Sequence, residues 1–178
     1  KQDASLRVFD NKPSYVVKNP MTKDHEIVRS DLLPSMLEIV EYNVAHQQEN
    51  LALFEISSVD RPEGNKVYLS LALRGNKSLT ERYQSRPYDF FDMKGVIEAL
   101  FARLGIPETR YRLSYSKNPA FHPGASADIR MGKDLVGTFG QLHPSFSSDK
   151  VFLGEIDLGY LLALKGRNTK FTPYSTLS

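Results

Sequence analysis

The chain has 178 residues, of which 40% are hydrophobic and 25% are charged, a composition typical of one soluble globular domain. It contains no cysteine, which excludes disulfides, thiolate metal sites and cysteine nucleophiles. The formal net charge of +2 gives no electrostatic reason to expect non-specific nucleic-acid binding, and no apolar run approaches the roughly 20 residues of a membrane span.

No repeat, linker or low-complexity segment divides the chain, so we expect a single domain over residues 1–178. The first residue is Lys1 and no signal peptide follows it, so we expect a piece excised from a longer protein. The lack of cysteine suits the reducing cytoplasm.

The first part of the chain predicts a short strand at residues 15–17 and a helix from Pro34 to Gln47. Proline is tolerated in a first helical turn because its missing N–H is not needed there. Ser30 and Asp31, just upstream, are candidate caps. Apolar residues recur on one face of this helix at Leu33, Met36, Leu37, Val40 and Val44.

A β-hairpin is predicted next, with strands over residues 51–59 and 67–74. The second strand alternates Val67, Leu69, Leu71 and Leu73 with smaller or more polar residues. Residues 60–65 have the composition of a turn.

The strongest helix pattern covers residues 91–104. Asp89 is suited to cap its start, and Gly105 stands where a left-handed residue ends many helices, with Pro107 following. The three-four spacing is carried by Met93, Val96, Ile97, Leu100, Phe101 and Leu104.

Short strands dominate the remainder of the chain. They are predicted at residues 111–116, 127–131, 135–142 and 151–156, with a tight turn at 132–134 and a final short helix at 158–164. Because strands and helices do not alternate regularly, we predict an α+β fold, an antiparallel sheet flanked by helices.

Histidines and acids offer little catalytic signal. His122 and His143 each precede proline, which favours extended backbone, so we expect both near strand ends, fixing turns by local hydrogen bonds. No histidine pair has the spacing of a helical zinc site, and we predict no metal site. Asp89 and Asp92 fit a helix start better than acid–base chemistry. Glu155 lies in a predicted strand, where it can face solvent or pair with a base.

Glycine and serine motifs are equally uninformative. Gly137 and Gly140 lie inside a strand pattern, where close backbone packing explains them better than nucleotide binding. No Gly-x-Ser-x-Gly motif occurs. The densest basic and aromatic stretch, residues 82–88, is interpreted as a solvated loop. Composition and residue spacing alone therefore predict an α+β domain without a recognisable active site.

Several short sequence motifs, in the same order along the chain, show a resemblance to a known family. They are Asn19-Pro20-Met21, Arg29 to Pro34 followed by Asn43, Leu53 to Ile56, Phe90 to Gly95, Phe121 to Ala127, Gly137 to Pro144 and Phe171 to Ser175. Over about residues 19–175 the chain thereby resembles the catalytic-like core module of the phenylalanyl-tRNA synthetase β subunit of bacterial type.

The resemblance implies the fold of a class II aminoacyl-tRNA synthetase catalytic domain without catalysis, because in that family the α subunit carries the active site. It implies packing against α in an (αβ)₂ heterotetramer that joins phenylalanine to tRNA with ATP and magnesium. This chain alone would then be no enzyme and would hold no cofactor.

The residues agree with lost catalysis. An active class II site needs an arginine that holds the ATP phosphate through charge and paired hydrogen bonds. If Phe54 matches the aromatic residue of that motif, the arginine position holds Glu55, an anion that repels phosphate. The glycine-rich strand ending in arginine, which forms the third motif of the class, is absent.

Three hypotheses follow. The first is a scaffold for the α subunit, with interface candidates Arg29, Leu33, Leu37, Val40 and Val44, each of which core packing explains equally well. The second is residual small-molecule or tRNA binding in the degenerate cleft, with candidates Glu55, His122, Arg130 and His143. The third is an unrelated hydrolase that uses the two histidines.

Overall fold

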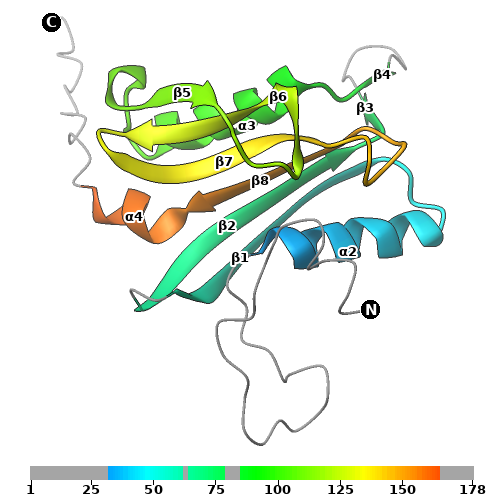
Figure 1. Cartoon of the computed structure of the whole chain (residues 1–178), viewed down its shortest axis with the longest axis horizontal. Coiled ribbons are helices and arrows are strands. Elements are labelled where there is room, and N and C mark those ends of the chain that lie inside the picture. The colour runs from blue at the N-terminus through cyan, green and yellow to red at the C-terminus, as the bar shows by residue number, and fades with distance from the viewer. Residues whose placement is uncertain (1–31, 62–63, 79–84, 165–178) are drawn as a thin grey trace, which may run out of the picture.

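A six-stranded antiparallel sheet forms the centre of the molecule (Figure 1). The structure is a computed structural model and describes residues 32–61, 64–78 and 85–164. Strand order across the sheet is β1-β2-β8-β7-β6-β5, and β3 and β4 form a separate two-stranded ribbon. In chain order the elements are α2 (Leu33–Ala45), β1 (Leu51–Arg61), β2 (Gly64–Arg74), β3 (Asn76–Ser78), β4 (Ser85–Pro87), α3 (Phe90–Arg103), the short 3₁₀ helix η2 (Glu108–Arg110), β5 (Arg112–Tyr115), β6 (Phe121–Met131), β7 (Asp134–Leu142), β8 (Val151–Asp157) and α4 (Leu158–Ala163).

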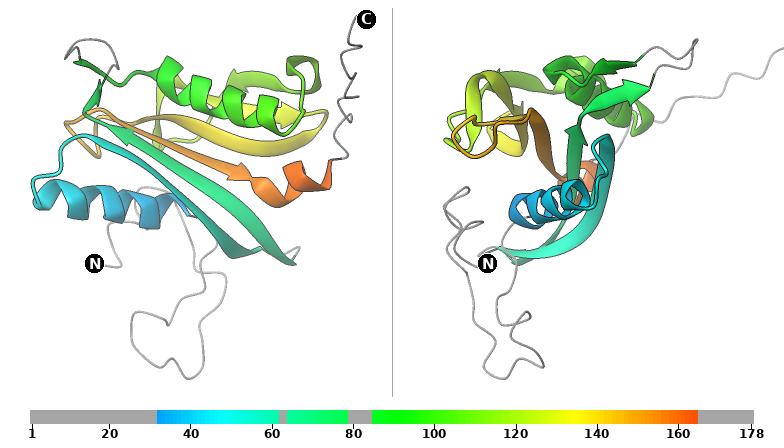
Figure 2. Two further views of the ribbon diagram at one scale, coloured as in Figure 1. Left: turned by 180° about the vertical axis from the view of Figure 1, so that it is seen from behind. Right: turned by 90° about the vertical axis from the view of Figure 1, so that its right-hand side faces the viewer.

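The predicted α+β class is confirmed, with each main helix on its own face of the sheet (Figures 1 and 2). The predicted strand at residues 15–17, the candidate caps Ser30 and Asp31, and Arg29 lie outside the described residues. No helix in the described ranges is both long enough and apolar enough to cross a membrane.

The predicted β1–β2 hairpin is present, but its turn is tighter than expected. Asp60 pairs with Asn65 and Arg61 pairs with Gly64, so both strands extend into the segment predicted as a turn. Asn65 Nδ2 donates to Asp60 Oδ1 at 2.9 Å, so a pair of turn-forming residues stabilises the strands instead. A second hairpin turns at Gly132, whose φ of 62° fits glycine, and Asp134 already belongs to β7.

Strand β6 begins six residues earlier than the predicted residue 127, at Phe121. Pro123 argues against a strand because it has no N–H to donate. The structure accommodates it at a register shift between Phe121 and Ser126. The prediction was wrong at this boundary because an irregularity in pairing tolerates what a regular ladder excludes.

The core divides between the two faces of the sheet. Under α3 and α4 lie Leu69, Leu71, Leu73, Met93, Ile97, Phe101, Ile106, Ala127, Ile129, Met131, Val136, Phe139, Phe152, Ile156, Leu158 and Leu161. Under α2 lie Leu33, Met36, Leu37, Val40, Leu51, Ala72, Phe121, Leu142, Val151 and Leu153. Because both faces are covered, Ser70 and Ala72, the polar and small partners in the alternation of β2, are as buried as its leucines.

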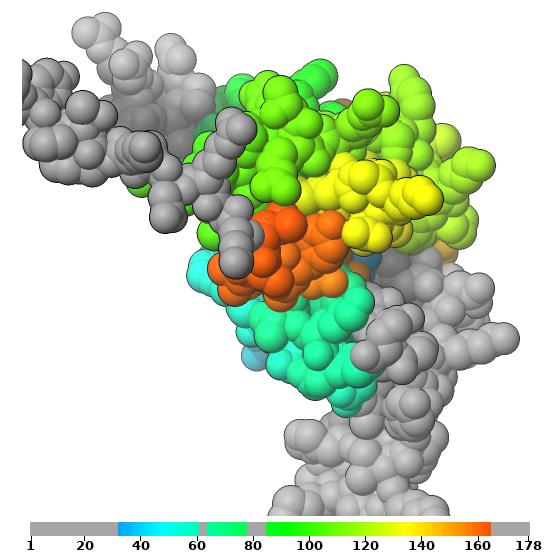
Figure 3. All heavy atoms as spheres, turned by 90° about the vertical axis from the view of Figure 1, so that its left-hand side faces the viewer, coloured from blue at the N-terminus to red at the C-terminus, as the bar shows by residue number. Residues whose placement is uncertain are grey.

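The predicted packing role of the β7 glycines is confirmed. A Cβ on Gly140 would lie 2.6 Å from the Ser126 side chain, and one on Gly137 would lie 2.7 Å from the Glu155 carbonyl. Figure 3, which faces one end of the sheet, shows α4 filling the surface between the β1–β2 hairpin and the β6–β7 turn.

Candidate functional site

A row of polar side chains crosses the sheet on the face that α2 partly covers. Residues paired across antiparallel strands point to the same face, and the pairing runs without interruption through all six strands. From β1 to β5 the row, which we call the polar row, contains Glu55, Ser70, Glu155, Thr138, Asp128 and Ser114. Three of these six are carboxylates, and none is basic.

Hydrogen bonds tie the polar row together at its β6–β7 end. Thr138 Oγ1 donates to Asp128 Oδ1 at 3.1 Å and lies 3.3 Å from Ser116 Oγ. In its centre Ser70 is fully buried, and Glu155 is only 6% exposed. Glu155 Oε1 accepts the backbone N–H of Leu32 at 2.9 Å. The centre of this face is therefore acidic and closed by α2.

Arg130 is the cleft candidate that brings positive charge to this face. Its Nη2 lies 3.6 Å from Asp128 Oδ2, and its side chain is exposed. It is not in the polar row itself, because Arg130 pairs with Arg112 at the outer end of β6. The arginine is thus engaged by a carboxylate at the margin of the sheet.

The two histidines lie next to each other, as local turn-formers. Their ring centroids are 6.5 Å apart. His122 Nδ1 accepts the N–H of Gly124 at 3.0 Å, and His143 Nδ1 accepts the N–H of Ser145 at 3.2 Å. The prediction that both rings fix turns is confirmed. Within residues 32–61, 64–78 and 85–164, no group of three or more His, Asp or Glu residues has the geometry to hold a metal ion.

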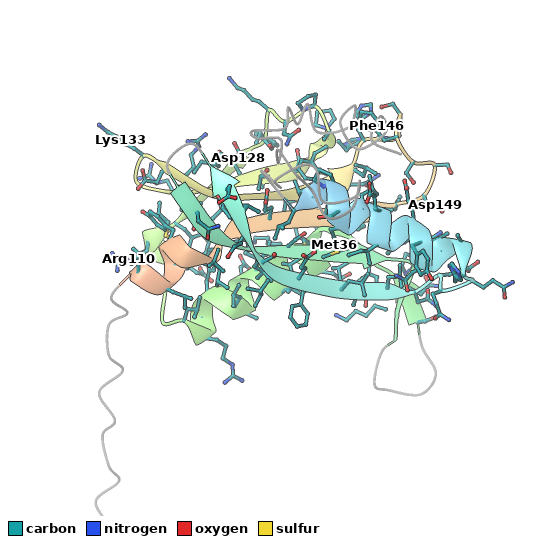
Figure 4. All side chains as sticks on the ribbon, turned by 90° about the horizontal axis from the view of Figure 1, so that it is seen from below. Met36, Arg110, Asp128, Lys133, Phe146 and Asp149 are labelled. Atoms are coloured by element: carbon teal, nitrogen blue, oxygen red, sulfur yellow. The ribbon has the colours of Figure 1, made fainter. Side chains whose placement is uncertain are left out.

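The cleft candidates do not converge. His122 and Arg130 lie near opposite ends of the 11-residue strand β6. In Figure 4, Phe146, whose ring contacts that of His143, lies toward one end of the sheet, and Asp128, the partner of Arg130, lies toward the other. A single bound small molecule would not contact both histidines and Glu55. The structure brings together instead Glu55, Ser70 and Glu155, neighbours across three strands.

A polar recess lies beyond the end of the sheet, with a volume of about 230 Å³. Arg74 closes one side by donating to the Glu49 carbonyl at 2.7 Å and to Asp149 Oδ2 at 2.6 Å. Because the arginine is already paired with an acid, it holds loops together, and Asp149 marks this end of the molecule in Figure 4.

A second cluster of charges anchors the β3–β4 ribbon to α3. Asp92 accepts two hydrogen bonds from Arg86, each of 2.7 Å, and one from Lys77 at 3.2 Å. The hydrogen bonding from Arg86 is the main cause that lowers the pKa of Asp92 to about 2. Its carboxylate also accepts the N–H of Asp89, and Asp89 accepts that of Asp92, so the predicted cap is confirmed as a capping box.

The interface candidates on α2 face the sheet. Leu33, Leu37 and Val40 are buried in the core, and Val44 packs against it. The outer face of this helix carries Ile39 and Tyr42, the latter 64% exposed. A partner that meets α2 would contact this outer face.

The edge strand β1 carries exposed apolar side chains on the face of the sheet opposite α2. Phe54 is 70% exposed and Ile56 is 55% exposed. They continue the apolar rows of the α3 face, since Phe54 pairs with Leu71 and Ile56 with Leu69. Among the strands that the structure describes, none pairs with the outer edge of β1. The unpaired backbone groups of an edge strand can pair with another element or chain.

Residues 1–158 match the family model described as the phenylalanyl tRNA synthetase beta chain CLM domain, a class II catalytic-like module. The chain belongs to this family. A phenylalanine–tRNA ligase beta subunit of Symbiobacterium thermophilum is 41% identical to this CLM domain over 141 residues, 75% of the chain. One of Fusobacterium nucleatum is 36% identical over 162 residues, 82% of the chain.

The CLM domain spans only 16% and 20% of the length of these two relatives. Among solved structures, a pyrrolysyl-tRNA synthetase of Desulfitobacterium hafniense superposes with a TM-score of 0.57 at 12% identity, covering 90% of this chain and 66% of that one. This likeness shows the fold, and the predicted class II synthetase architecture is confirmed.

Sequence reasoning named Glu55 and Arg130 on this face but missed the polar row that lies between them. Its members are separated by up to 100 residues, from Glu55 to Glu155, and only the strand order brings them together. A polar residue in a strand can be recognised from the sequence, but its neighbours on the next strands cannot.

Proposed function

We propose that this CLM domain is a non-catalytic module of the β subunit that holds the α subunit of phenylalanine–tRNA ligase. The assembly would be an (αβ)₂ heterotetramer in which α, with ATP and magnesium, charges tRNA with phenylalanine. The observation that carries the proposal is the 11-residue edge strand β1, whose Phe54 and Ile56 are exposed on the α3 face of the sheet.

The α2 helix and the edge of β1 offer two neighbouring surfaces for a partner, which would wrap around the sheet edge because Phe54 and Ile56 point to the face opposite α2. Both lie on the same side of the molecule in Figures 1 and 2, and Leu51 and Leu53 of β1 pack with the core under α2. The outer face of α2 contributes Ile39 and Tyr42, and β1 contributes two apolar side chains and its backbone edge. Aromatic residues in the centre of an interface commonly carry much of its binding energy.

The polar row supports the non-catalytic part of the proposal. Transfer of an aminoacyl group through an adenylate requires cations that neutralise the phosphate oxygens of ATP. On this face of the sheet, Glu55 of the edge strand β1 and Glu155 of β8 lie on either side of Ser70. These two carboxylates would repel the negatively charged triphosphate of ATP. Arg130, at the margin of the sheet, is already paired with Asp128.

A pair of matched substitutions tests the docking surface. Phe54→Asp places a charge on the β1 surface, and Phe91→Asp places the same charge on α3, where the phenylalanine is 72% exposed. We expect Phe54→Asp to weaken binding to an α subunit by at least tenfold, and Phe91→Asp to leave it unchanged. Size-exclusion chromatography with light scattering measures the complex, and circular dichroism checks that both variants fold.

Equal binding by the wild type and Phe54→Asp would exclude β1 from the interface. Equal weakening by both variants would show that the effect comes from added charge and not from the site.

A further inference from the structure

The N-terminus of α2 is held by a residue from the far end of the chain. Leu32, the residue before the helix, has an N–H that donates to Glu155 Oε1, although the two residues are 123 positions apart. Both residues are buried, and Leu32 makes no side-chain cap of its own. The contact supplies one of the acceptors that the first N–H groups of a helix lack.

Glu155 lies on a strand that is paired on both sides. Strand β8 pairs with β2 on one side and β7 on the other, and Glu155 itself pairs with Ser70 and Thr138. A Cβ on Gly137 of β7 would lie 2.7 Å from the carbonyl of Glu155, so the two strands approach closely here. The carboxylate is therefore carried by a backbone that is hydrogen-bonded to both neighbouring strands.

The charge of Glu155 suits the position as well as its geometry does. The N-terminus of a helix carries a partial positive charge, and a carboxylate beside it is stabilising. The next acid on the same strand repeats the arrangement, because Asp157 Oδ1 accepts the N–H of Tyr160 at 2.8 Å and caps α4. One strand thus holds the first turns of two helices.

We propose that Glu155 is a positioning residue for binding of the α subunit. It fixes the N-terminal end of α2 to the central strand and thereby sets the direction in which Ile39 and Tyr42 are presented. The inference rests on the proposed docking role of α2 and β1. It goes beyond that role because Glu155 does not belong to the docking surface and acts through the helix.

Amide hydrogen exchange in this 178-residue chain tests the anchoring step without any partner. In Glu155→Ala we expect the amide of Leu32, and that of Met36, which donates to the Leu32 carbonyl at 2.9 Å, to exchange about tenfold faster. Amides of the β2–β8 ladder should keep their rates. Glu155→Gln retains an acceptor without the charge, so its effect should be smaller.

Asp157→Ala is the matched control, since it removes a capping acid from the same strand. It should accelerate exchange at Tyr160 and leave Leu32 unaffected. Unchanged exchange at Leu32 in Glu155→Ala would overturn the anchoring step, as would equal acceleration throughout the sheet. If Glu155→Ala does not fold, Glu155→Gln decides by the same criteria.

The second readout is affinity for the α subunit. We expect Glu155→Ala to weaken it about tenfold, Glu155→Gln less, and Asp157→Ala not at all. If the wild type binds and Glu155→Ala and Glu155→Gln bind equally well, the positioning role is wrong while the docking proposal stands. If the wild type does not bind, the docking proposal itself fails and takes the positioning role with it.

Discussion

The two long helices differ in how their first turns are held. At the start of α3, Asp89 and Asp92 cap the helix reciprocally within four residues of chain. At the start of α2, the N–H of Leu32 donates to Glu155, which belongs to β8 near the other end of the described chain. The first arrangement is local and the second is tertiary.

This difference separates what each helix depends on. Helix α3 has a capping signal that acts as soon as the helix begins to form. The first turn of α2 depends on β8, so it is completed only when the sheet is in place. The outer side of α2, where we propose that the partner binds, is thus coupled to the packing of the sheet.

Removing core side chains under each helix should cause the largest losses in the free energy of unfolding. Phe101 of α3 and Met36 of α2 are both almost fully buried. We expect Phe101→Ala to lower the free energy of unfolding by about 3–5 kcal/mol and Met36→Ala by about 2–5 kcal/mol. Urea denaturation measures both. A loss below about 1 kcal/mol for either would mean that the helix is not part of the core.

Acid should weaken the local anchor of α3 through Asp92. Because hydrogen bonding from Arg86 lowers the pKa of Asp92 from its ordinary 3.8 to about 2, the ionised group stabilises the fold. That contribution is fully present above about pH 4 and is lost as the pH falls toward 2, by roughly 2 kcal/mol in all.

Asp92→Asn provides the comparison for this pH dependence. The variant should be less stable at pH 7, and the difference from the wild type should shrink between pH 4 and pH 2. Unfolding by urea at a series of pH values measures it. A constant difference across that range would contradict the assigned role of the carboxylate.

Loss of the Asp89 cap at the start of α3 should lower the free energy of unfolding by a smaller amount. Asp89→Ala removes the acceptor for the Asp92 N–H, and we expect about 1 kcal/mol of destabilisation. The protection of α2 amides should not change, because their anchor lies elsewhere. Thermal unfolding together with amide exchange measures both parts, and faster exchange in α2 would show that the two helices are not held independently.

The smallest loss of stability is expected from removing a surface ion pair on α3. Lys94 Nζ lies 3.1 Å from Glu98 Oε1, an ion pair one turn apart. Surface pairs of this spacing contribute about 0.3–0.5 kcal/mol, so Lys94→Ala should shift the urea midpoint only slightly. A loss comparable with that of Asp89→Ala would mean that side-chain pairing, and not capping, stabilises this helix.

Features that depend on neighbouring residues were predictable from the sequence. The α3 cap, the left-handed Gly105 with φ of 71°, and the β1–β2 hairpin all follow from residues close in the chain. The motifs shared with the synthetase family predicted the class II fold, which local patterns do not specify. The start of β6 was missed because Pro123 hides a strand with irregular pairing.

The candidate site was predicted less well, for a physical reason. Apolar spacing on α2 identified Leu33, Leu37 and Val40 correctly as one face, but spacing does not say whether a face meets the sheet or a partner. Glu155 was visible only as an acid in a strand. Its contact with Leu32 depends on the strand order, which places β8 beneath the start of α2.

A titration tests most directly our proposal that this CLM domain holds the α subunit. The purified chain is mixed with a phenylalanine–tRNA ligase α subunit and the mass of the complex is followed by size-exclusion chromatography with light scattering. We expect a stable complex with equal numbers of the two chains, which Phe54→Asp disrupts and Phe91→Asp does not. A folded chain that elutes separately from α at micromolar concentrations would contradict it.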